Sequence, residues 1–254
     1  MSQIKLEELQ IFYTQQGQGQ DILCLHGWAL DHAMFEPTAK IFESEFRVSN
    51  LDLPGFGKST TLERPFSVED YAEVIHQFCL ELNINKPIII AHSFGARIAL
   101  VYASKYPVTK LILTGAAGLK PKRGLDYYLK IYTYKTLKHS SKLKFLKPAM
   151  AKLSQRFGSE DYKQTSGVLR QSFVLIVNQD LRSLLPLIQC PTLLIWGEKD
   201  EATPLWMGKI MEQEIKDAGL VIFEKDDHFA YWHQLDRFHR IITNFIQEDA
   251  NHVR

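Results

Sequence analysis

Residues 88–100 read Ile-Ile-Ile-Ala-His-Ser-Phe-Gly-Ala-Arg-Ile-Ala-Leu, and this stretch decides the fold. The β-branched run Ile88–Ile90 predicts a buried strand, and the apolar spacing of the last residues predicts a helix that packs back on it. Ser93 therefore lies at the corner between the two elements. Because Ala91 and Gly95 are small, strand and helix can approach closely enough for a sharp turn that carries the Ser93 hydroxyl outward. A nucleophile is expected at such a corner.

The serine has a second interpretation, because a buried serine is also a favoured N-cap residue of a helix. The five-residue pattern small-x-Ser-x-small, which Ala91 to Gly95 match, is short enough to occur by chance in a chain of 254 residues. Other segments must therefore decide between a nucleophile and a cap.

Length and composition predict a globular protein. A chain of 254 residues with 45% hydrophobic content fits one large α/β domain, or a core with an insertion. Three cysteines (Cys24, Cys79 and Cys190) are widely separated in apolar stretches and predict reduced, structural side chains. The amino terminus has no signal-sequence pattern, and no apolar segment reaches the ~20 residues of a membrane span. The expected location is the cytoplasm.

Charge is distributed unevenly along the chain, although the net charge is only +1. Residues 120–185 contain 14 Lys and Arg against 4 Asp and Glu, a net charge of +10, and the rest of the chain carries −9. One interpretation is a solvated helical surface rich in lysine. The other is a basic lobe that guides anionic ligands to an acidic body.

Short apolar runs alternate with helical patterns in the outer parts of the chain. The expected strands are 22–25, 47–51, 88–90, 111–113, 192–196 and 220–223, with an edge strand at 10–14. The expected helices are 36–42, 69–82 with an N-cap at Ser67, 96–106, 205–215 and 235–246. This alternation predicts an α/β fold, a doubly wound and mostly parallel sheet with helices on both faces. Residues 119–185 lack such strands and predict a helical cap, which leaves 1–118 and 186–254 as the core.

Reactive side chains follow four of the expected strands, and ligands collect at the carboxyl ends of parallel strands. His26-Gly27-Trp28, Ser93, residues 197–200 and Asp227-His228-Phe229 each follow one strand. A serine nucleophile needs a base, and the base needs an acid that fixes its tautomer. Ser93, His228 and Asp200 supply these three parts.

Other acids compete with Asp200 for His228. Asp226 and Asp227 adjoin the histidine, but sequence neighbours usually point apart, whereas Asp200 arrives from a neighbouring strand end. We therefore favour Asp200, with Glu198 as the second choice.

Taken together, these motifs resemble the α/β-hydrolase fold superfamily. The His-Gly segment matches His26-Gly27-Trp28, and the Asp-x-Pro-Gly-x-Gly-x-Ser loop matches residues 52–59. The elbow matches residues 91–95, with Ala91 where glycine is usual, and the acid loop and late histidine match residues 197–200 and His228. The match covers most of the chain outside 119–185.

The resemblance implies further roles near Ser93. The amides of Trp28 and Phe94 would form an oxyanion hole, and candidates for the substrate pocket are the side chains of His26, Trp28, Phe94 and Phe229. Trp28 could equally be core packing, and His26 is expected to hold its loop rather than act as the base.

Two motifs point to other chemistry and are discounted. Residues 52–59 end in Gly-Lys-Ser, but Asp52 stands where a phosphate-binding loop has glycine, and the following residues are a poor helix start. His228 and His233 are five apart and do not share a helical face, which disfavours a metal site. We expect no metal, no organic cofactor and no nucleic acid partner.

The sequence therefore predicts a serine hydrolase that cleaves carboxylic esters of modest size through an acyl-enzyme. It resembles small bacterial carboxylesterases, including those that act on methyl esters carried by acyl carrier protein, so the substrate could be anionic or borne on an acidic protein. Alternatives are a thioesterase, a C–C bond hydrolase, or a non-catalytic protein that binds a small molecule.

Overall fold

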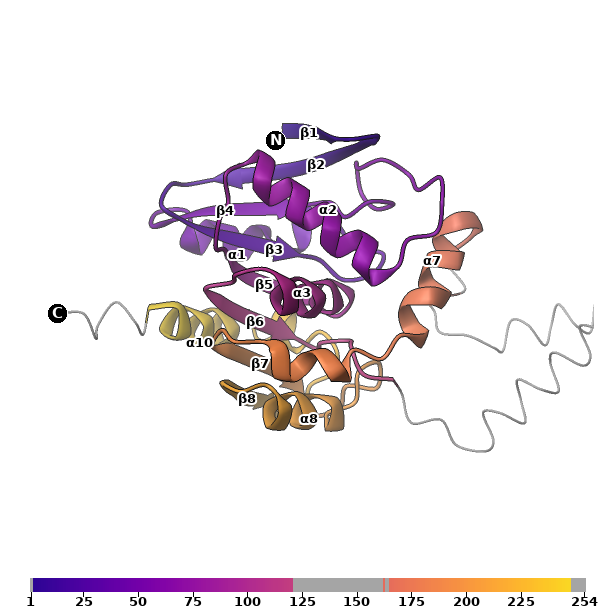
Figure 1. Ribbon diagram of the computed structural model, residues 1–254. Helices are drawn as coiled ribbons and strands as arrows, with labels where there is room; N and C mark the ends of the chain where they lie inside the picture. The colour runs from indigo at the N-terminus through magenta and orange to yellow at the C-terminus, as the bar shows by residue number, and fades with distance from the viewer. Residues whose placement is uncertain (1, 121–161, 163–164, 248–254) are drawn as a thin grey trace, which may run out of the picture.

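The computed structural model describes residues 2–120, 162 and 165–247, and within them it contains an eight-stranded sheet of order β1-β2-β4-β3-β5-β6-β7-β8 (Figure 1). The strands are β1 Ser2–Leu6, β2 Leu9–Gln16, β3 Gln20–Leu25, β4 Phe46–Leu51, β5 Ile88–His92, β6 Lys110–Thr114, β7 Thr192–Gly197 and β8 Ala218–Phe223. The β1–β2 and β2–β4 pairs are antiparallel, and the other pairs are parallel. The prediction of a mostly parallel sheet is confirmed.

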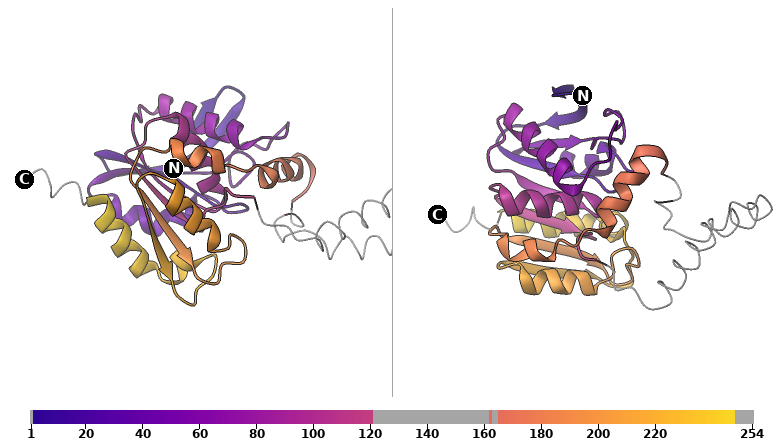
Figure 2. Two further views of the ribbon diagram at one scale, coloured as in Figure 1. Left: turned by 60° about the horizontal axis from the view of Figure 1, so that its bottom comes forward. Right: turned by 45° about the vertical axis from the view of Figure 1, so that its right-hand side comes forward.

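Helices cover both faces of this sheet (Figure 2). The helices of the described residues are α1 Glu36–Phe42, α2 Val68–Glu81, α3 Phe94–Lys105, α7 Gly167–Asn178, α8 Trp206–Glu214, α9 Ala230–His233 and α10 Leu235–Gln247, with 3-10 turns η1 His32–Phe35 and η3 Arg182–Leu187. Of these, α7 lies to the side of the sheet rather than on a face (Figure 1). Buried side chains of α2, α3 and α8 form one core with the sheet, and those of α1, α9 and α10 form a second core on the opposite face. The doubly wound α/β architecture is therefore as predicted.

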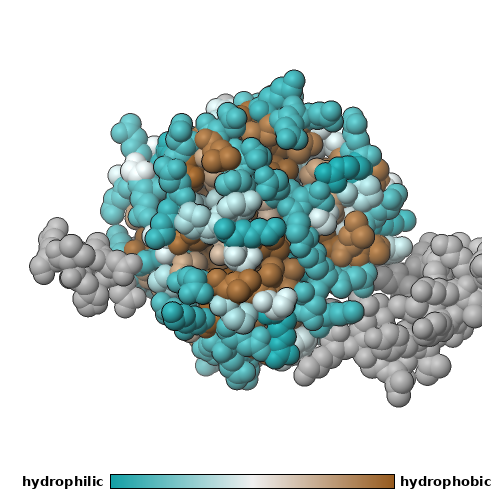
Figure 3. Space-filling model, in the orientation of Figure 1, coloured by the Kyte–Doolittle hydropathy of each residue, from teal (hydrophilic) through white to brown (hydrophobic). Residues whose placement is uncertain are grey.

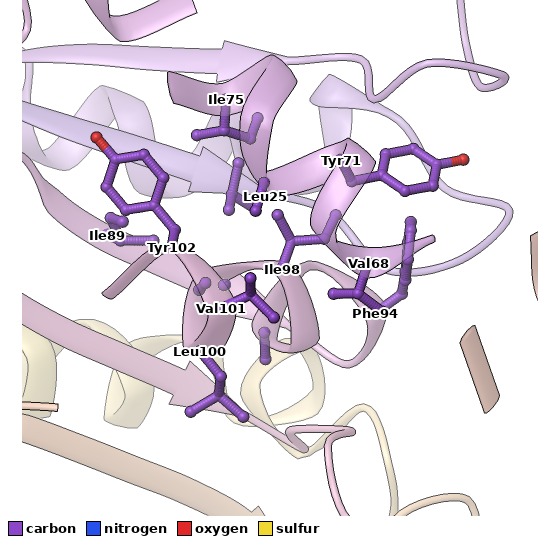
Figure 4. Close-up of a cluster of buried hydrophobic side chains, with 14 of the residues drawn as sticks. Leu25, Val68, Tyr71, Ile75, Ile89, Phe94, Ile98, Leu100, Val101 and Tyr102 are labelled. Carbon is purple, nitrogen blue, oxygen red and sulfur yellow. The ribbon is translucent and has the colours of Figure 1, made fainter. Parts of the chain in front are cut away.

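The helix α2 begins where the sequence predicts, at the N-cap Ser67. The Ser67 hydroxyl accepts from the Asp70 N–H, and the Asp70 carboxylate accepts from the Ser67 N–H at 2.7 Å, which is a capping box. The buried face of α2 then packs against α3, and Figure 4 shows Tyr71 of α2 close to Phe94 of α3. Their ring centroids are 5.0 Å apart in an edge-to-face arrangement. This contact ties the helix that follows Ser93 to its neighbour.

The predicted edge strand at 10–14 is wrong in its position within the sheet. It forms part of β2, which lies between β1 and β4, and the edge is β1. The turn between β1 and β2 contains Glu7 at φ 52°, a conformation that hairpins usually signal with glycine, asparagine or aspartate. Because Glu7-Glu8 carries no such signal, the sequence pattern conceals the hairpin.

The helical cap predicted for 119–185 falls mostly outside the described residues, which exclude 121–161 and 163–164. Most of the basic residues and most of the predicted cap aromatics lie there too. The described part of the interval contains α7 and the start of η3. Whether residues 119–185 form a separate cap stays a prediction.

The described surface is mixed in polarity. The face in Figure 3 is largely hydrophilic, with separate hydrophobic areas rather than one broad patch. Among the described residues, no helix combines the length and the apolar character that crossing a membrane requires.

Candidate active site

Ser93 sits at a strained corner between β5 and α3. It has φ 50° and ψ −106°, a backbone conformation that costs a non-glycine residue about 1–3 kcal/mol. Main-chain hydrogen bonds hold the corner, because the Ser93 N–H donates to Thr114 O at 3.1 Å and Ser93 O accepts from the Ala117 N–H at 3.2 Å. At Gly95 a Cβ atom would lie 2.2 Å from Leu25 O, so only glycine lets α3 approach β3 this closely.

His228 connects Ser93 to Asp200 through its two ring nitrogens. His228 Nε2 lies 2.9 Å from Ser93 Oγ, and His228 Nδ1 lies 2.7 Å from Asp200 Oδ2. The tautomer with a proton on Nδ1 satisfies both contacts, because Nδ1–H then donates to the carboxylate and Nε2 accepts from the hydroxyl. The Asp200 side chain is fully buried, whereas the His228 side chain keeps 16% of its surface exposed. The structure thus brings the three predicted residues together.

The Asp200 carboxylate has a further partner, Thr203, to which the sequence analysis assigned no role. The Thr203 N–H donates to Asp200 Oδ1 and its hydroxyl to Asp200 Oδ2, both at 2.8 Å. The indole N–H of the buried Trp196 donates to Thr203 O at 2.6 Å, which fixes the loop that contains Asp200 and Thr203 against β7. The signal was available, because an aspartate followed three residues later by threonine is typical of a capped turn.

The competing acids bond elsewhere. Asp226 accepts from His233 Nδ1 and Gln234 Nε2, at 2.7 and 2.8 Å. Asp227 accepts from the Phe229 N–H, and Glu198 accepts from the Lys225 N–H. Asp200 is the acid that the geometry joins to His228.

Two glycines allow the loop that carries Asp200 and the loop that carries His228 to lie close together. At Gly115 a Cβ atom would lie 3.0 Å from His228 Nδ1 and 3.3 Å from Asp200 Oδ2. At Gly197 a Cβ atom would lie 2.0 Å from Asp227 O. A side chain at either position would separate the loop of Asp200 from that of His228.

Comparison with known proteins identifies the family. A family model described as alpha/beta hydrolase fold matches residues 22–234, most of the chain. The chain belongs to the α/β hydrolase fold family. It therefore comes from a family of hydrolytic enzymes.

Three relatives cover almost the whole of this α/β hydrolase. The AB hydrolase superfamily protein YisY of Bacillus subtilis is 30% identical, over 95% of this chain and 97% of the relative. The 2-hydroxy-6-oxo-6-phenylhexa-2,4-dienoate hydrolase of Comamonas testosteroni is 25% identical, over 98% and 95%. The pimeloyl-(acyl-carrier protein) methyl ester esterase of Vibrio parahaemolyticus is 25% identical, over 91% and 96%. The similarity to esterases of this last kind is as predicted.

Aromatic side chains of the hydrolase gather next to the Ser93 corner. The Trp28 ring centroid lies 5.0 Å from that of Phe94 and 4.9 Å from that of Phe56, both nearly edge-to-face. Phe173 of α7 also makes an edge-to-face contact with Trp28, and their ring centroids are 5.0 Å apart. We call Trp28, Phe56, Phe94 and Phe173 the aromatic wall. All four side chains are buried.

The predicted oxyanion donors come from two of these residues. Phe94 is the first residue of α3, so its N–H lies in the first turn, where helical N–H groups have no acceptor within the helix. Trp28 follows β3 in the loop that begins at His26, and its ring is in contact with that of Phe94. Their role as donors stays a prediction.

His26 is buried and bonds within its own surroundings. Its Nε2 accepts from the Leu53 N–H at 2.9 Å, and its Nδ1 donates to Gly27 O at 2.7 Å. Burial lowers the pKa of His26 to about 4. The ring therefore stays neutral and links the His-Gly loop to the loop of residues 52–59, which is the loop-holding role expected of it.

Two more aromatic rings flank His228. Phe229 is 40% exposed, and its ring centroid lies 5.4 Å from that of His228. His92 is buried, with its ring centroid 4.7 Å from that of His228 and its Nδ1 donating to Thr114 O at 3.0 Å. Burial, and secondarily the neighbouring His228, hold the pKa of His92 well below its ordinary value. His92 therefore adds no positive charge beside the histidine that contacts Ser93.

Two clusters in the described residues have the donor types and spacing of a metal site. They are Asp31, His32 and Asp52, and Asp226, Asp227 and His233. In the first cluster, the His32 backbone N–H and its Nδ1 both contact Asp52 Oδ1 at 2.7 Å, so His32 and Asp52 are already hydrogen-bonded to each other. In the second, His233 and Asp226 are similarly paired. Neither cluster includes Ser93, His228 or Asp200.

Proposed function

We propose that this α/β hydrolase is a serine hydrolase that cleaves carboxylic esters of modest size. Ser93 is the nucleophile, His228 the general base and acid, and Asp200 the group that orients the imidazole. One observation carries the proposal: Ser93 Oγ, the two nitrogens of His228 and Asp200 Oδ2 form a continuous chain with links of 2.9 and 2.7 Å. A hydroxyl becomes an effective nucleophile when such a base can take its proton.

The reaction proceeds in two halves. In the first, Ser93 Oγ attacks the ester carbonyl carbon and gives its proton to His228 Nε2. The C–O bond to the alcohol then breaks, and His228 returns the proton to the departing oxygen, which leaves an acyl group on Ser93. In the second half, water attacks the acyl carbon, gives a proton to His228, and Ser93 Oγ leaves with that proton as the acid is released. The buried Asp200 carboxylate stabilises the imidazolium formed in each half.

Negative charge develops on the former carbonyl oxygen each time a tetrahedral intermediate forms. The Trp28 and Phe94 amides are the donors that we propose for this charge. The position of Phe94 at the start of α3 supports its part, because N–H groups there are free to donate and the helix dipole favours an anion. Each donor of this kind contributes ~3 kcal/mol to transition-state stabilisation.

The experiment compares three substrate classes with the purified protein and its Ser93→Ala variant. The classes are p-nitrophenyl esters of increasing acyl length, the matching thioesters, and a 2-hydroxy-6-oxodienoate of the type named for the Comamonas relative. We expect the highest kcat/KM for an oxygen ester, and its loss in Ser93→Ala. A higher kcat/KM for the dienoate would favour a C–C bond hydrolase. Binding without turnover of any class would favour a binding protein.

The charge asymmetry of the chain supports a preference for anionic esters, or for an ester on an acidic carrier protein. The excess of +10 in residues 120–185 would raise the encounter rate of such substrates, and salt would weaken it as the Debye length falls from ~10 Å at 0.1 M to ~3 Å at 1 M. A neutral ester measured in parallel is the control. Equal salt dependence of kcat/KM for a neutral ester and one with a distal carboxylate would contradict this preference.

A further inference from the structure

The helix α7 contributes one side chain to the aromatic wall beside Ser93. The ring of Phe173 is in edge-to-face contact with that of Trp28, and the Trp28 ring is in edge-to-face contact with that of Phe94, the residue after Ser93. Phe173 is thus two ring contacts removed from Phe94. The position of α7 therefore sets the far end of the aromatic wall.

Arg97 connects α7 to the helix that follows Ser93. It lies one turn into α3, four residues after Ser93, and only 4% of its surface is exposed. Its Nη1 donates to Ile176 O at 2.7 Å and to Gln179 O at 2.8 Å. These carbonyls belong to the last turn and the C-cap of α7, where the helix dipole favours a cation; Ile176 O also accepts from the Gln179 N–H at 3.3 Å.

A buried cation at this place has a cost that an apolar side chain would avoid. Burial lowers the pKa of Arg97 to about 10, so the guanidinium remains charged at neutral pH while it has lost most of its water. Well-packed apolar residues in place of buried charges are often neutral or stabilising. Stability alone is therefore a weak reason for an arginine here. The arginine instead adds two hydrogen bonds of defined direction, which connect α3 to the C-terminal end of α7.

We propose that Arg97 is a positioning residue that holds α7, and through it Phe173, against the aromatic wall, and so determines how tightly the site takes esters with an extended apolar acyl chain. This inference rests on the proposed ester hydrolysis at Ser93. Because Phe173 is two ring contacts away from Phe94, we expect the binding of a short acyl group at Ser93 not to depend on it. The binding of a long acyl chain along the wall does depend on it.

Other contacts keep α7 near the core when Arg97 is replaced. The Phe66 N–H donates to Ser172 Oγ on α7 at 2.9 Å, and the Leu181 N–H donates to Gly118 O at 2.9 Å just beyond the helix. Loss of the Arg97 link should therefore shift the helix rather than unfold the protein.

The test compares p-nitrophenyl acetate with p-nitrophenyl octanoate in Arg97→Met, Arg97→Lys and Phe173→Ala. The matched control is Arg182→Met, which removes an exposed ion pair with Glu214 shortly after α7. We expect Arg97→Met to raise KM for the octanoate about tenfold with little change in kcat, and to leave the acetate within about twofold. Phe173→Ala should raise KM for the octanoate by a larger factor than KM for the acetate, Arg97→Lys should recover part of the Arg97→Met effect, and Arg182→Met should show none.

Thermal unfolding and fluorophosphonate labelling of Ser93 accompany the kinetics. An equal change of KM for both esters in folded Arg97→Met, or no change for either, would overturn the inference. If Arg97→Met does not fold, Phe173→Ala decides, and its failure to separate the two esters would overturn the inference alone. A folded wild-type protein that hydrolyses neither ester would overturn the proposed function, and this inference with it.

Discussion

Thr203 donates its hydroxyl to the same carboxylate oxygen of Asp200 that accepts from His228. Together with the Thr203 N–H, which donates to the other carboxylate oxygen, this hydroxyl fixes the orientation of the Asp200 carboxylate. A hydrogen bond to a charged group contributes about 1.5–3 kcal/mol. Thr203 is therefore expected to hold the Asp200 carboxylate in position for His228 without touching the substrate.

Replacement of Thr203 by valine should lower kcat/KM about tenfold or more, because each 1.36 kcal/mol corresponds to a factor of ten. KM should change little, because Thr203 contacts Asp200 and not the substrate. Thr203→Ser keeps the hydroxyl and is the control. A kcat in Thr203→Val equal to that of the wild-type protein would contradict the assigned role.

Asp200→Asn should reduce kcat by orders of magnitude, because the amide can hold the imidazole in the wrong tautomer; the corresponding substitution in a serine protease triad lowers kcat ~10⁴-fold. Asp227→Asn is the matched variant, since Asp227 is next to His228 but bonds to the Phe229 N–H. Steady-state rates of both variants with one ester make the comparison. A larger loss in Asp227→Asn would show that the acid has been wrongly assigned.

Gly95→Ala should destabilise the protein severely, by about 3 kcal/mol or more, because its Cβ would lie 2.2 Å from Leu25 O and 2.7 Å from His26 O. The clash is with main chain, which cannot rotate away. Gly219→Ala is the control, since a Cβ atom there meets nothing within 4 Å. Urea unfolding of the two variants measures the difference. Similar stabilities would mean that α3 is not packed against β3 as described.

Stability should fall as the pH drops below about 6.5. Burial lowers the folded-state pKa of His26, His92 and His239, so the unfolded chain binds protons that the folded chain does not. Each such histidine removes up to about 1.4 kcal/mol per pH unit between its unfolded and folded pKa. His233 acts in the opposite direction, because its hydrogen bond to Asp226 raises its pKa.

Urea unfolding at about pH 7.5 and about pH 5 checks the net sign, which we expect to be a loss at the lower pH. His26→Gln should make the dependence shallower, because it removes one of the three histidines whose pKa is lowered by burial. Greater stability at the lower pH would show that ion pairs such as His233–Asp226 outweigh the buried histidines.

Local patterns were sufficient to predict most of the fold. The capping residues Ser67 and Asp70, which are three positions apart, mark the start of α2. β-Branched runs such as Ile88–Ile90 identify buried strands. The β1–β2 hairpin was missed because its turn uses Glu7 in a conformation that the residue type does not signal. The predicted start of α3 at Ala96 is two residues late, since the helix begins directly after Ser93.

The candidate site was predictable in its reactive groups but not in their support. Ser93, His228 and Asp200 follow strand ends, which topology brings to one edge of the sheet. Thr203 lies only three residues after Asp200, so its contact is local but is not announced by the family motifs. Arg97 acts through contacts that only the fold creates, with carbonyls of a helix far along the sequence. For Arg97 a signal exists in hindsight, since a charge within the apolar first turns of a helix must find a buried partner.

The most direct test of the central claim is the reaction of the wild-type protein with a fluorophosphonate, followed by mass spectrometry of its peptides. An activated Ser93 predicts one covalent adduct, located on Ser93, which is absent in folded Ser93→Ala and forms at least about 100-fold more slowly in His228→Gln. Labelling at another residue, no labelling of the folded protein, or an equal rate in His228→Gln would contradict the account.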